Sequence, residues 1–169
     1  AVKDALAIGY RHIDTAAYYG NEREVGHGLR LSGVNRDEVF VTTKIRPDAA
    51  MPDDFAPVVD QCLENLQLPQ VDLLLIHWPS KTVPIKLTIG ALCKARKEGK
   101  AKHIGVSNFT TALLDEAWAA TAALDLKVPA DVQLQLFQEL ALLLRRQTFW
   151  LARSAARHDA TVEGLIKAY

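Results

Sequence analysis

The sequence predicts an α/β fold in which parallel strands and helices alternate and curve toward a barrel. Segments with the period of a strand and segments with the period of a helix follow one another strictly along the 169 residues. Such alternation is typical of right-handed βαβ units on a parallel sheet. In addition, three short apolar segments carry a polar residue at or just past their end, where a parallel barrel places its active site.

The first half of the chain divides into elements at recognisable start and stop residues. Gly9 and Gly33 follow helical patterns at the position where a helix terminus favours glycine. Asn21, with Glu24 three residues later, predicts a capping box at the start of a helix. The expected elements are a helix at 1–8, a strand at 10–15, a helix at 21–32, a strand at 38–44, a helix at 52–66 and a strand at 71–76, whose continuous apolar run suits a strand covered on both sides.

The second half continues the same alternation. The expected elements are a helix at 85–98, a strand at 103–107, a helix at 111–124, a strand at 131–136, a helix at 139–158 and a strand at 161–165. No shift in composition and no Ser/Gly linker divides the chain, so residues 1–169 are expected to form a single domain with about six strands.

A complete eight-fold barrel needs about 250 residues. About two βα units are therefore expected to be absent, and the chain is expected to be a piece of something longer. Open edge strands would make such a chain marginally stable or self-associating.

Composition and charge favour a globular protein of the cytoplasm. Apolar residues make up 49% of the chain and charged residues 24%, and twenty basic residues balance twenty acidic ones. This balance gives no support to nucleic acid or an anionic membrane as a partner, and no apolar run approaches the length of a membrane span. Cys62 and Cys93 fall in helical patterns and fit a reducing compartment. No metal is expected, because zinc-type Cys/His spacing is absent.

Asp14, Tyr19, Lys44 and His77 supply the groups needed to hand a proton to a carbonyl oxygen. A phenol with an ordinary pKa near 10 releases its proton reluctantly at neutral pH, and a nearby ammonium stabilises the phenolate. Lys44 would be that ammonium, and Asp14 would hold it charged and oriented. His77 would hydrogen-bond the carbonyl oxygen. Barrel geometry would bring all four side chains to one rim.

Each of these residues also has a purely structural explanation. An aspartate after a strand is often a turn former or helix cap, and a histidine there can close the strand through a hydrogen bond. Tyr18 or Tyr19 would equally serve as a half-buried aromatic residue, and Lys44 as a solvated strand end. The occurrence of all four in this order favours the catalytic interpretation.

Three further polar residues suit a carboxamide ligand. Ser107 and Asn108 end the segment IGVSNF with a hydroxyl and an amide. Gln133 lies inside an otherwise apolar strand pattern and offers the same chemistry. A polar side chain that close to a core needs a partner, and an internal hydrogen bond is the alternative for Gln133.

The segments GYRHIDTAAYYGNE, VTTKI, DLLLIHWP and GVSNF together resemble the successive signatures of the aldo-keto reductase family. The resemblance covers roughly residues 1–136 and looks closest to small bacterial members such as 2,5-diketo-D-gluconate and methylglyoxal reductases. It implies a (β/α)8 TIM barrel, incomplete in this chain, that binds NADPH without a Rossmann motif and reduces aldehydes and ketones. Family members are monomers.

Residue roles follow from the same resemblance. Tyr19 matches the proton donor, rather than its neighbour Tyr18, and Trp78 would contact the substrate at the mouth of the site. The remaining matches are Asp14, Lys44 and His77 at the other catalytic positions, and Ser107, Asn108 and Gln133 at the positions that hold the nicotinamide carboxamide.

The chain also departs from the family pattern. The opening hairpin and first strand are not present, nor is the closing third, whose basic cluster grips the adenosine 2′-phosphate. The expected run after Gln133 is replaced by LQLFQ, and Leu165 stands where an aromatic residue usually stacks on the nicotinamide. These departures keep two alternatives open, a catalytically inactive barrel fragment and a non-catalytic relative that binds a partner.

Overall fold

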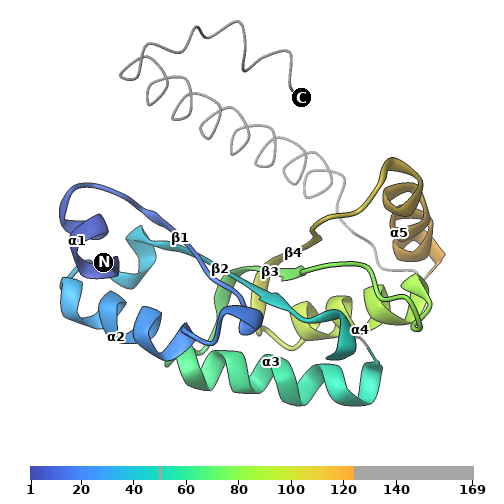
Figure 1. Cartoon of the computed structure of the whole chain (residues 1–169), viewed down its shortest axis with the longest axis horizontal. Coiled ribbons are helices and arrows are strands. Elements are labelled where there is room, and N and C mark those ends of the chain that lie inside the picture. Colours follow the sequence, from blue (N-terminus) through green and yellow to red (C-terminus); the bar gives the residue numbers. More distant parts are fainter. Residues whose placement is uncertain (50, 124–169) are drawn as a thin grey trace, which may run out of the picture. The chain divides into compact units, whose positions relative to one another are not determined.

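The described part of this computed structural model, residues 1–49 and 51–123, is built on a parallel four-stranded sheet (Figure 1). The strands are β1 (His12–Asp14), β2 (Phe40–Ile45), β3 (Val71–Ile76) and β4 (Ala101–Val106), paired in the order β1-β2-β3-β4. All three pairings are parallel. The described residues belong to one compact unit, so the prediction of an α/β fold with parallel strands is confirmed.

Helices connect the successive strands and cover one face of the sheet (Figure 1). The α-helices are α1 (Val2–Ala7), α2 (Glu22–Ser32), α3 (Pro52–Leu66), α4 (Ile85–Lys97) and α5 (Thr111–Ala123). Short 3-10 helices form η1 (Ala17–Tyr19), η2 (Arg36–Glu38) and η3 (Pro47–Ala49). No helix among the described residues is long and apolar enough to cross a membrane.

Most predicted elements lie within two residues of their expected bounds, and α3 and β3 match them. The sequence did not predict the 3-10 helices, and η2 takes the residues before β2, so that strand begins at Phe40 rather than at residue 38. The elements expected at 131–136, 139–158 and 161–165 lie outside the described residues. The prediction of a single domain over 1–169 therefore remains a prediction.

The capping box predicted at Asn21 is wrong, although α2 begins there. Asn21 is the N-cap residue, but its side chain makes no hydrogen bond to the helix. Its Oδ1 instead accepts a hydrogen bond from Thr15 Oγ1 at 2.7 Å. The local signal failed because a hydroxyl outside the helix takes the acceptor that would otherwise cap it.

The hydrophobic core lies between the sheet and helices α2, α3 and α4. Val59, Cys62 and Leu66 on the predicted apolar face of α3 are buried. Helix α2 approaches α3 at Gly26, where an added Cβ would lie 2.2 Å from the Leu66 carbonyl oxygen. This contact holds the middle of α2 close against the end of α3.

Strand β3 carries a polar residue within its apolar run. Asp72 is buried, and its Oδ2 accepts hydrogen bonds from Arg36 Nη2 at 2.7 Å and from the Val41 N–H at 2.9 Å. Lys102 Nζ lies 2.8 Å from the other carboxylate oxygen. The carboxylate joins η2, β2, β3 and β4 at the end of the sheet where the strands begin, so its role is structural.

Candidate functional site

The four residues expected to move a proton lie together at the carboxyl ends of the strands. Asp14 is the last residue of β1, Lys44 is the next-to-last residue of β2, and His77 directly follows β3. Tyr19 ends η1, the short helix after β1. Because β1, β2 and β3 are neighbours in register, their ends form a continuous edge. Residues that lie far apart in the sequence are therefore brought side by side along this edge.

Lys44 is the buried centre of this group. Its Nζ lies 2.6 Å from Asp14 Oδ2 and donates to the Thr15 carbonyl oxygen at 2.9 Å. The same nitrogen lies 5.1 Å from the centre of the Tyr19 ring. Burying an ammonium is costly unless it is paired and hydrogen-bonded, and Asp14 and Thr15 supply both. The arrangement holds a positive charge beside a phenol.

His77 also lies beside Tyr19. The two rings meet edge to face, with centroids 5.6 Å apart. The backbone N–H of His77 donates to the Ile45 carbonyl oxygen at 2.9 Å. Burial, followed by the charge of Lys44, lowers the pKa of His77, against a smaller opposite effect of Asp14. The imidazole is therefore neutral near pH 7. Its Nδ1 is buried with no hydrogen-bond partner among the described residues.

Aromatic side chains surround the histidine at the surface. Trp78 stacks on His77 with ring centroids 3.7 Å apart. Tyr18 meets the Trp78 ring edge to face at 6.1 Å and the His77 ring at 6.2 Å. Tyr18 and Trp78 are both exposed, so they form an apolar wall that a small ligand can contact. The sequence pointed to Trp78, whereas it treated Tyr18 only as the alternative to Tyr19.

Ser107 and Asn108 follow β4 and join its end to that of β3. The Ser107 N–H donates to the Ile76 carbonyl oxygen at 2.8 Å. Asn108 Nδ2 donates to the His77 carbonyl oxygen at 2.7 Å and to Ser107 Oγ at 3.2 Å. Asn108 has a φ of 62°, a left-handed conformation that asparagine tolerates better than most residues. Gln133, the third residue expected here, lies outside the described residues.

Behind the site lies a buried carboxylate that the sequence analysis missed. Glu22 Oε1 accepts a hydrogen bond from Thr43 Oγ1 at 2.5 Å, and both residues are buried. Cys62 lies beside this pair: burial and then the charge of Glu22 raise the pKa of its thiol. The only sequence signal was a glutamate in the first turn of a predicted helix, where acidic residues are common on solvated surfaces.

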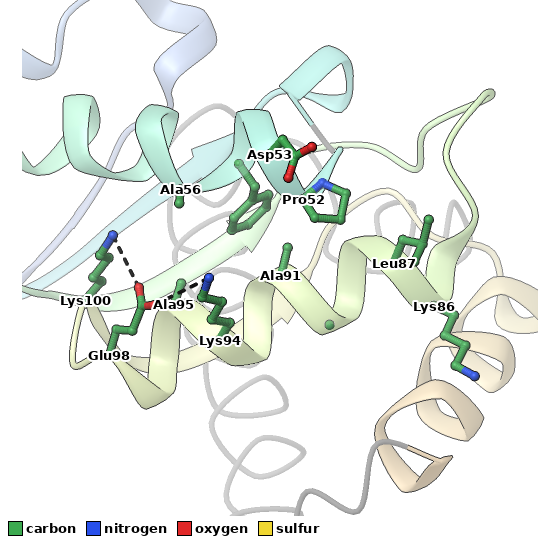
Figure 2. Close-up of a pocket in the computed structure, with 12 residues that line it drawn as sticks. Pro52, Asp53, Ala56, Lys86, Leu87, Ala91, Lys94, Ala95, Glu98 and Lys100 are labelled. Atoms are coloured by element: carbon green, nitrogen blue, oxygen red, sulfur yellow. Dashed lines mark ion pairs between the residues drawn. The ribbon is translucent and has the colours of Figure 1, made fainter.

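A cavity of about 290 Å³ lies elsewhere, between α3 and α4 (Figure 2). Pro52 and Ala56 of α3 and Leu87 and Ala91 of α4 line it, and none of the described residues predicted for the site does. At one end Glu98 forms ion pairs with Lys94 and Lys100 (Figure 2). Small side chains at the helix contact account for the cavity, so we assign the chemistry to the strand ends instead.

Comparisons with known proteins identify the family of this chain. The model of the Aldo/keto reductase family matches residues 1–138. A second model, Glutamate dehydrogenase, C-terminal, matches residues 109–169, which is less than half of the chain. The first match contains all the described strands and the residues at their ends.

Individual relatives give the same result. The chain is 37% identical over 190 residues to the methylglyoxal reductase DkgB of Escherichia coli O157:H7, a match that covers 100% of this chain and 71% of that protein. It is 47% identical over 116 residues to a glyoxal reductase of Bacillus subtilis (strain 168), covering 69% of this chain and 42% of the relative.

A solved structure also matches. The crystal structure of a Bombyx mori aldo-keto reductase in complex with NADP aligns with a TM-score of 0.67 and 37% identity. That alignment covers 70% of this chain and 43% of the Bombyx mori chain. The present chain thus spans less than half of that structure.

Proposed function

This chain belongs to the aldo/keto reductase family, and on that premise we propose that it carries the catalytic centre of an NADPH-dependent carbonyl reductase. The reaction converts an aldehyde or ketone into an alcohol. The observation that supports it best is the position of Lys44 Nζ, 2.6 Å from Asp14 Oδ2 and 5.1 Å from the centre of the Tyr19 ring. A charged lysine beside a phenol is an arrangement suited to proton donation.

In the proposed reaction Tyr19 gives its phenolic proton to the carbonyl oxygen of the substrate. The negative charge that develops on the phenol oxygen is stabilised by the Lys44 ammonium. Asp14 pairs with the Lys44 ammonium, and the Thr15 carbonyl oxygen fixes the direction of its Nζ. The three side chains act as a unit, because each one orients the next.

His77 is proposed to orient the substrate. A neutral imidazole carries one N–H, and a buried donor without an acceptor is unfavourable. His77 Nδ1 has no partner among the described residues, so we place the proton on Nε2. The Nε2–H can then donate to the carbonyl oxygen that Tyr19 protonates. Stacking on Trp78 and the bond from Asn108 to the His77 carbonyl oxygen hold the residue in place.

Ser107 and Asn108 fit a nicotinamide carboxamide. Ser107 Oγ accepts from Asn108 Nδ2, which leaves its own hydroxyl proton to donate, and Asn108 Oδ1 can accept. These two groups complement the carbonyl oxygen and the NH2 of a carboxamide, and Gln133 is proposed as the third. When bound, the reduced nicotinamide supplies the hydride that the carbonyl carbon receives.

The proposed substrate is a small carbonyl compound. Two relatives are named for methylglyoxal and for glyoxal, which are short dicarbonyl molecules. Tyr18 and Trp78 would provide the apolar contact for such a substrate, with no charged group needed to bind it.

The test is the oxidation of NADPH by the full chain with methylglyoxal, comparing wild type, Tyr19→Phe and Tyr18→Phe. Loss of the general acid should lower kcat by about two to four orders of magnitude in Tyr19→Phe. Tyr18→Phe is the matched variant, since it removes the adjacent hydroxyl and leaves a ring of the same size, and it should retain wild-type kcat within about threefold. Equal rates in wild type and Tyr19→Phe would overturn the assignment of Tyr19. NADPH binding without turnover in the wild type would favour a non-catalytic relative.

A further inference from the structure

We infer that Glu22 is a positioning residue, which holds Tyr19 in place against Lys44 through its hydrogen bond to Thr43. The catalytic meaning of this inference rests on the proposed function, whereas the placement of Tyr19 does not. Glu22 is 4% exposed, and no lysine, arginine or histidine among the described residues forms an ion pair or hydrogen bond with it. A buried carboxylate that is hydrogen-bonded by a neutral hydroxyl and has no cation paired with it among these residues is costly, so its position calls for an explanation.

Tyr19 makes no side-chain hydrogen bond to the described residues. The residue is 49% exposed, and it meets the site through ring contacts, at 5.1 Å to Lys44 Nζ and 5.6 Å to His77. Its backbone N–H donates to the Ala16 carbonyl oxygen inside the same turn. The position of the phenol is therefore set by how residues 15–22 are attached to the sheet.

The start of this segment is attached to β2. The Thr15 N–H donates to the Thr42 carbonyl oxygen at 2.9 Å, and the Thr15 carbonyl oxygen accepts from Lys44 Nζ. Thr15 Oγ1 also donates to Asn21 Oδ1 at 2.7 Å, which closes the segment into a loop around Tyr19. Closure alone fixes the shape of the loop but leaves it able to tilt as a body.

Glu22 attaches the other end of the loop to the same strand. Thr43, its partner, directly precedes Lys44, and successive side chains of a strand point to opposite faces of the sheet. Thr43 faces the helices and Glu22, whereas Lys44 faces the site. Two attachments to β2, at Thr15 and at Glu22, prevent the tilt. Because the hydroxyl–carboxylate bond is charge-assisted and buried, it is strong and directional.

If Glu22 only stabilised the fold, another variant that weakens the sheet would lower kcat equally. The chain offers a control for this alternative. Asp72 is also a buried carboxylate that joins elements of the sheet, but it lies where the strands begin, at the end opposite Tyr19. Arg36→Gln removes one cation from Asp72 and leaves Lys102 at 2.8 Å to pair with it. This variant loosens the sheet without touching residues 15–22.

The kinetic test compares wild type with Glu22→Met, Glu22→Gln and Arg36→Gln. Methionine keeps the volume of the side chain and removes both the acceptor and the buried charge, so we expect the packing at this site to be retained. We expect Glu22→Met to lower kcat for methylglyoxal reduction by about 10-fold to 100-fold, the effect of a catalytic group displaced by about 1 Å. KM for methylglyoxal and Kd for NADPH should stay within about threefold of wild type.

The two comparison variants separate positioning from stability. Glu22→Gln keeps an oxygen that accepts from Thr43, so its kcat should stay within about threefold of wild type. Arg36→Gln should lower Tm and leave kcat unchanged. An unchanged kcat in Glu22→Met, or an equal loss of kcat in Arg36→Gln, would overturn the inference.

An NMR measurement, which does not require turnover, completes the test. With tyrosine labelled only at its Cε atoms, which are equivalent in a flipping ring, each of the four tyrosines gives one signal, and the Tyr19 signal is the one lost in Tyr19→Phe. Glu22→Met should shift or broaden the Tyr19 signal, while Tyr10, 47% exposed and therefore a matched control, should not change. Arg36→Gln should leave both signals in place.

If the wild type reduces no carbonyl compound, that result overturns the proposed function but not the positioning of Tyr19 by Glu22. The NMR signals still decide the positioning. An unmoved Tyr19 signal in Glu22→Met would overturn the positioning role. Thr43→Val removes the same hydrogen bond from the donor side and gives the same comparison if Glu22→Met does not fold.

Discussion

Lys44 Nζ and Asp14 Oδ2 lie 2.6 Å apart, yet the lysine side chain is 9% exposed and the aspartate side chain 50% exposed. The ammonium is therefore removed from water, whereas its counter-charge remains partly solvated. A solvated carboxylate stays ionised easily, and a buried ammonium depends on it. Lys44 therefore depends on its pairing with Asp14 more than Asp14 depends on Lys44, and this gives the first prediction.

Asp14→Asn should lower kcat by about one to two orders of magnitude, because Lys44 loses the charge that pairs it, which corresponds to ~1.4–2.8 kcal/mol of barrier. The measurement is steady-state NADPH oxidation. Asp48→Asn is the matched control, since Asp48 pairs with Arg46 at 3.3 Å on the surface. Exposed pairs contribute little, so its kcat should match wild type. Similar losses in the two variants would contradict the proposed role of Asp14.

The pH dependence of stability should report the burial of His77. Burial and then Lys44 lower the pKa of His77 below its ordinary value of 6.5 in the folded chain. Below that ordinary value the unfolded chain binds a proton that the folded chain does not, so stability rises with pH in this window. The contribution of His77 is fully present above pH 6.5 and is lost as pH falls toward the folded pKa.

The measurement is urea unfolding between about pH 5 and pH 7, the range in which histidine changes charge. His77→Gln should flatten the rise of the free energy of unfolding with pH. His27→Gln is the control, because His27 is exposed on α2, and it should keep the wild-type slope. A slope that is unchanged in His77→Gln would show that the imidazole is not buried in its neutral form.

Asp72 should govern stability in acid. Burial alone would raise the pKa of this carboxyl, but hydrogen bonds from Lys102, the Val41 N–H and Arg36 outweigh it and lower the pKa. A folded pKa below the unfolded one means that the stability is present above about pH 4 and is lost as pH falls through the folded pKa.

Asp72→Asn should therefore lower the free energy of unfolding by about 2–4 kcal/mol at neutral pH, and the difference from wild type should shrink in acid. Denaturant unfolding at both pH values measures it. Asp37→Asn, an exposed change in η2, should stay within about 0.5 kcal/mol of wild type. A loss that is equal at neutral and acid pH would contradict the ionised role of Asp72.

Gly26→Ala should destabilise the chain, although alanine favours helices. The added Cβ would lie 2.2 Å from the Leu66 carbonyl oxygen, so α2 must move away from α3. We expect a loss of about 1–3 kcal/mol, the usual cost of overpacking, measured by denaturant unfolding. A free energy of unfolding that is unchanged in Gly26→Ala would show that α2 does not approach the Leu66 carbonyl oxygen this closely.

The sequence predicted those elements whose signals are local. Helix α3 has its expected bounds because Pro52 favours the first turn and the apolar face repeats at helical spacing. Strand β3 is a continuous apolar run, which few other structures explain. The start of β2 was missed because the Asn35 side chain accepts from the Asp37 N–H and stabilises η2.

The candidate site divides in the same way. Asp14, Lys44 and His77 could be found because each follows or ends a strand, and parallel strands end at one edge. Glu22 could not be found, since its burial depends on Thr43, a residue that lies 21 positions away. The capping box at Asn21 failed because a competing hydroxyl comes from Thr15, which lies between β1 and η1, outside the helix.

The order of strands β1, β2 and β3 has a consequence for how such a protein can change over evolutionary time. Asp14, Tyr19, Lys44 and His77 all come from one uninterrupted stretch, whereas Ser107 and Asn108 come after the next strand. A recombination event downstream of His77 would inherit the proposed acid–base group intact. New loops brought in by that exchange would meet the proposed proton donor already in place, so selection could act on the substrate without first rebuilding the chemistry proposed for these residues.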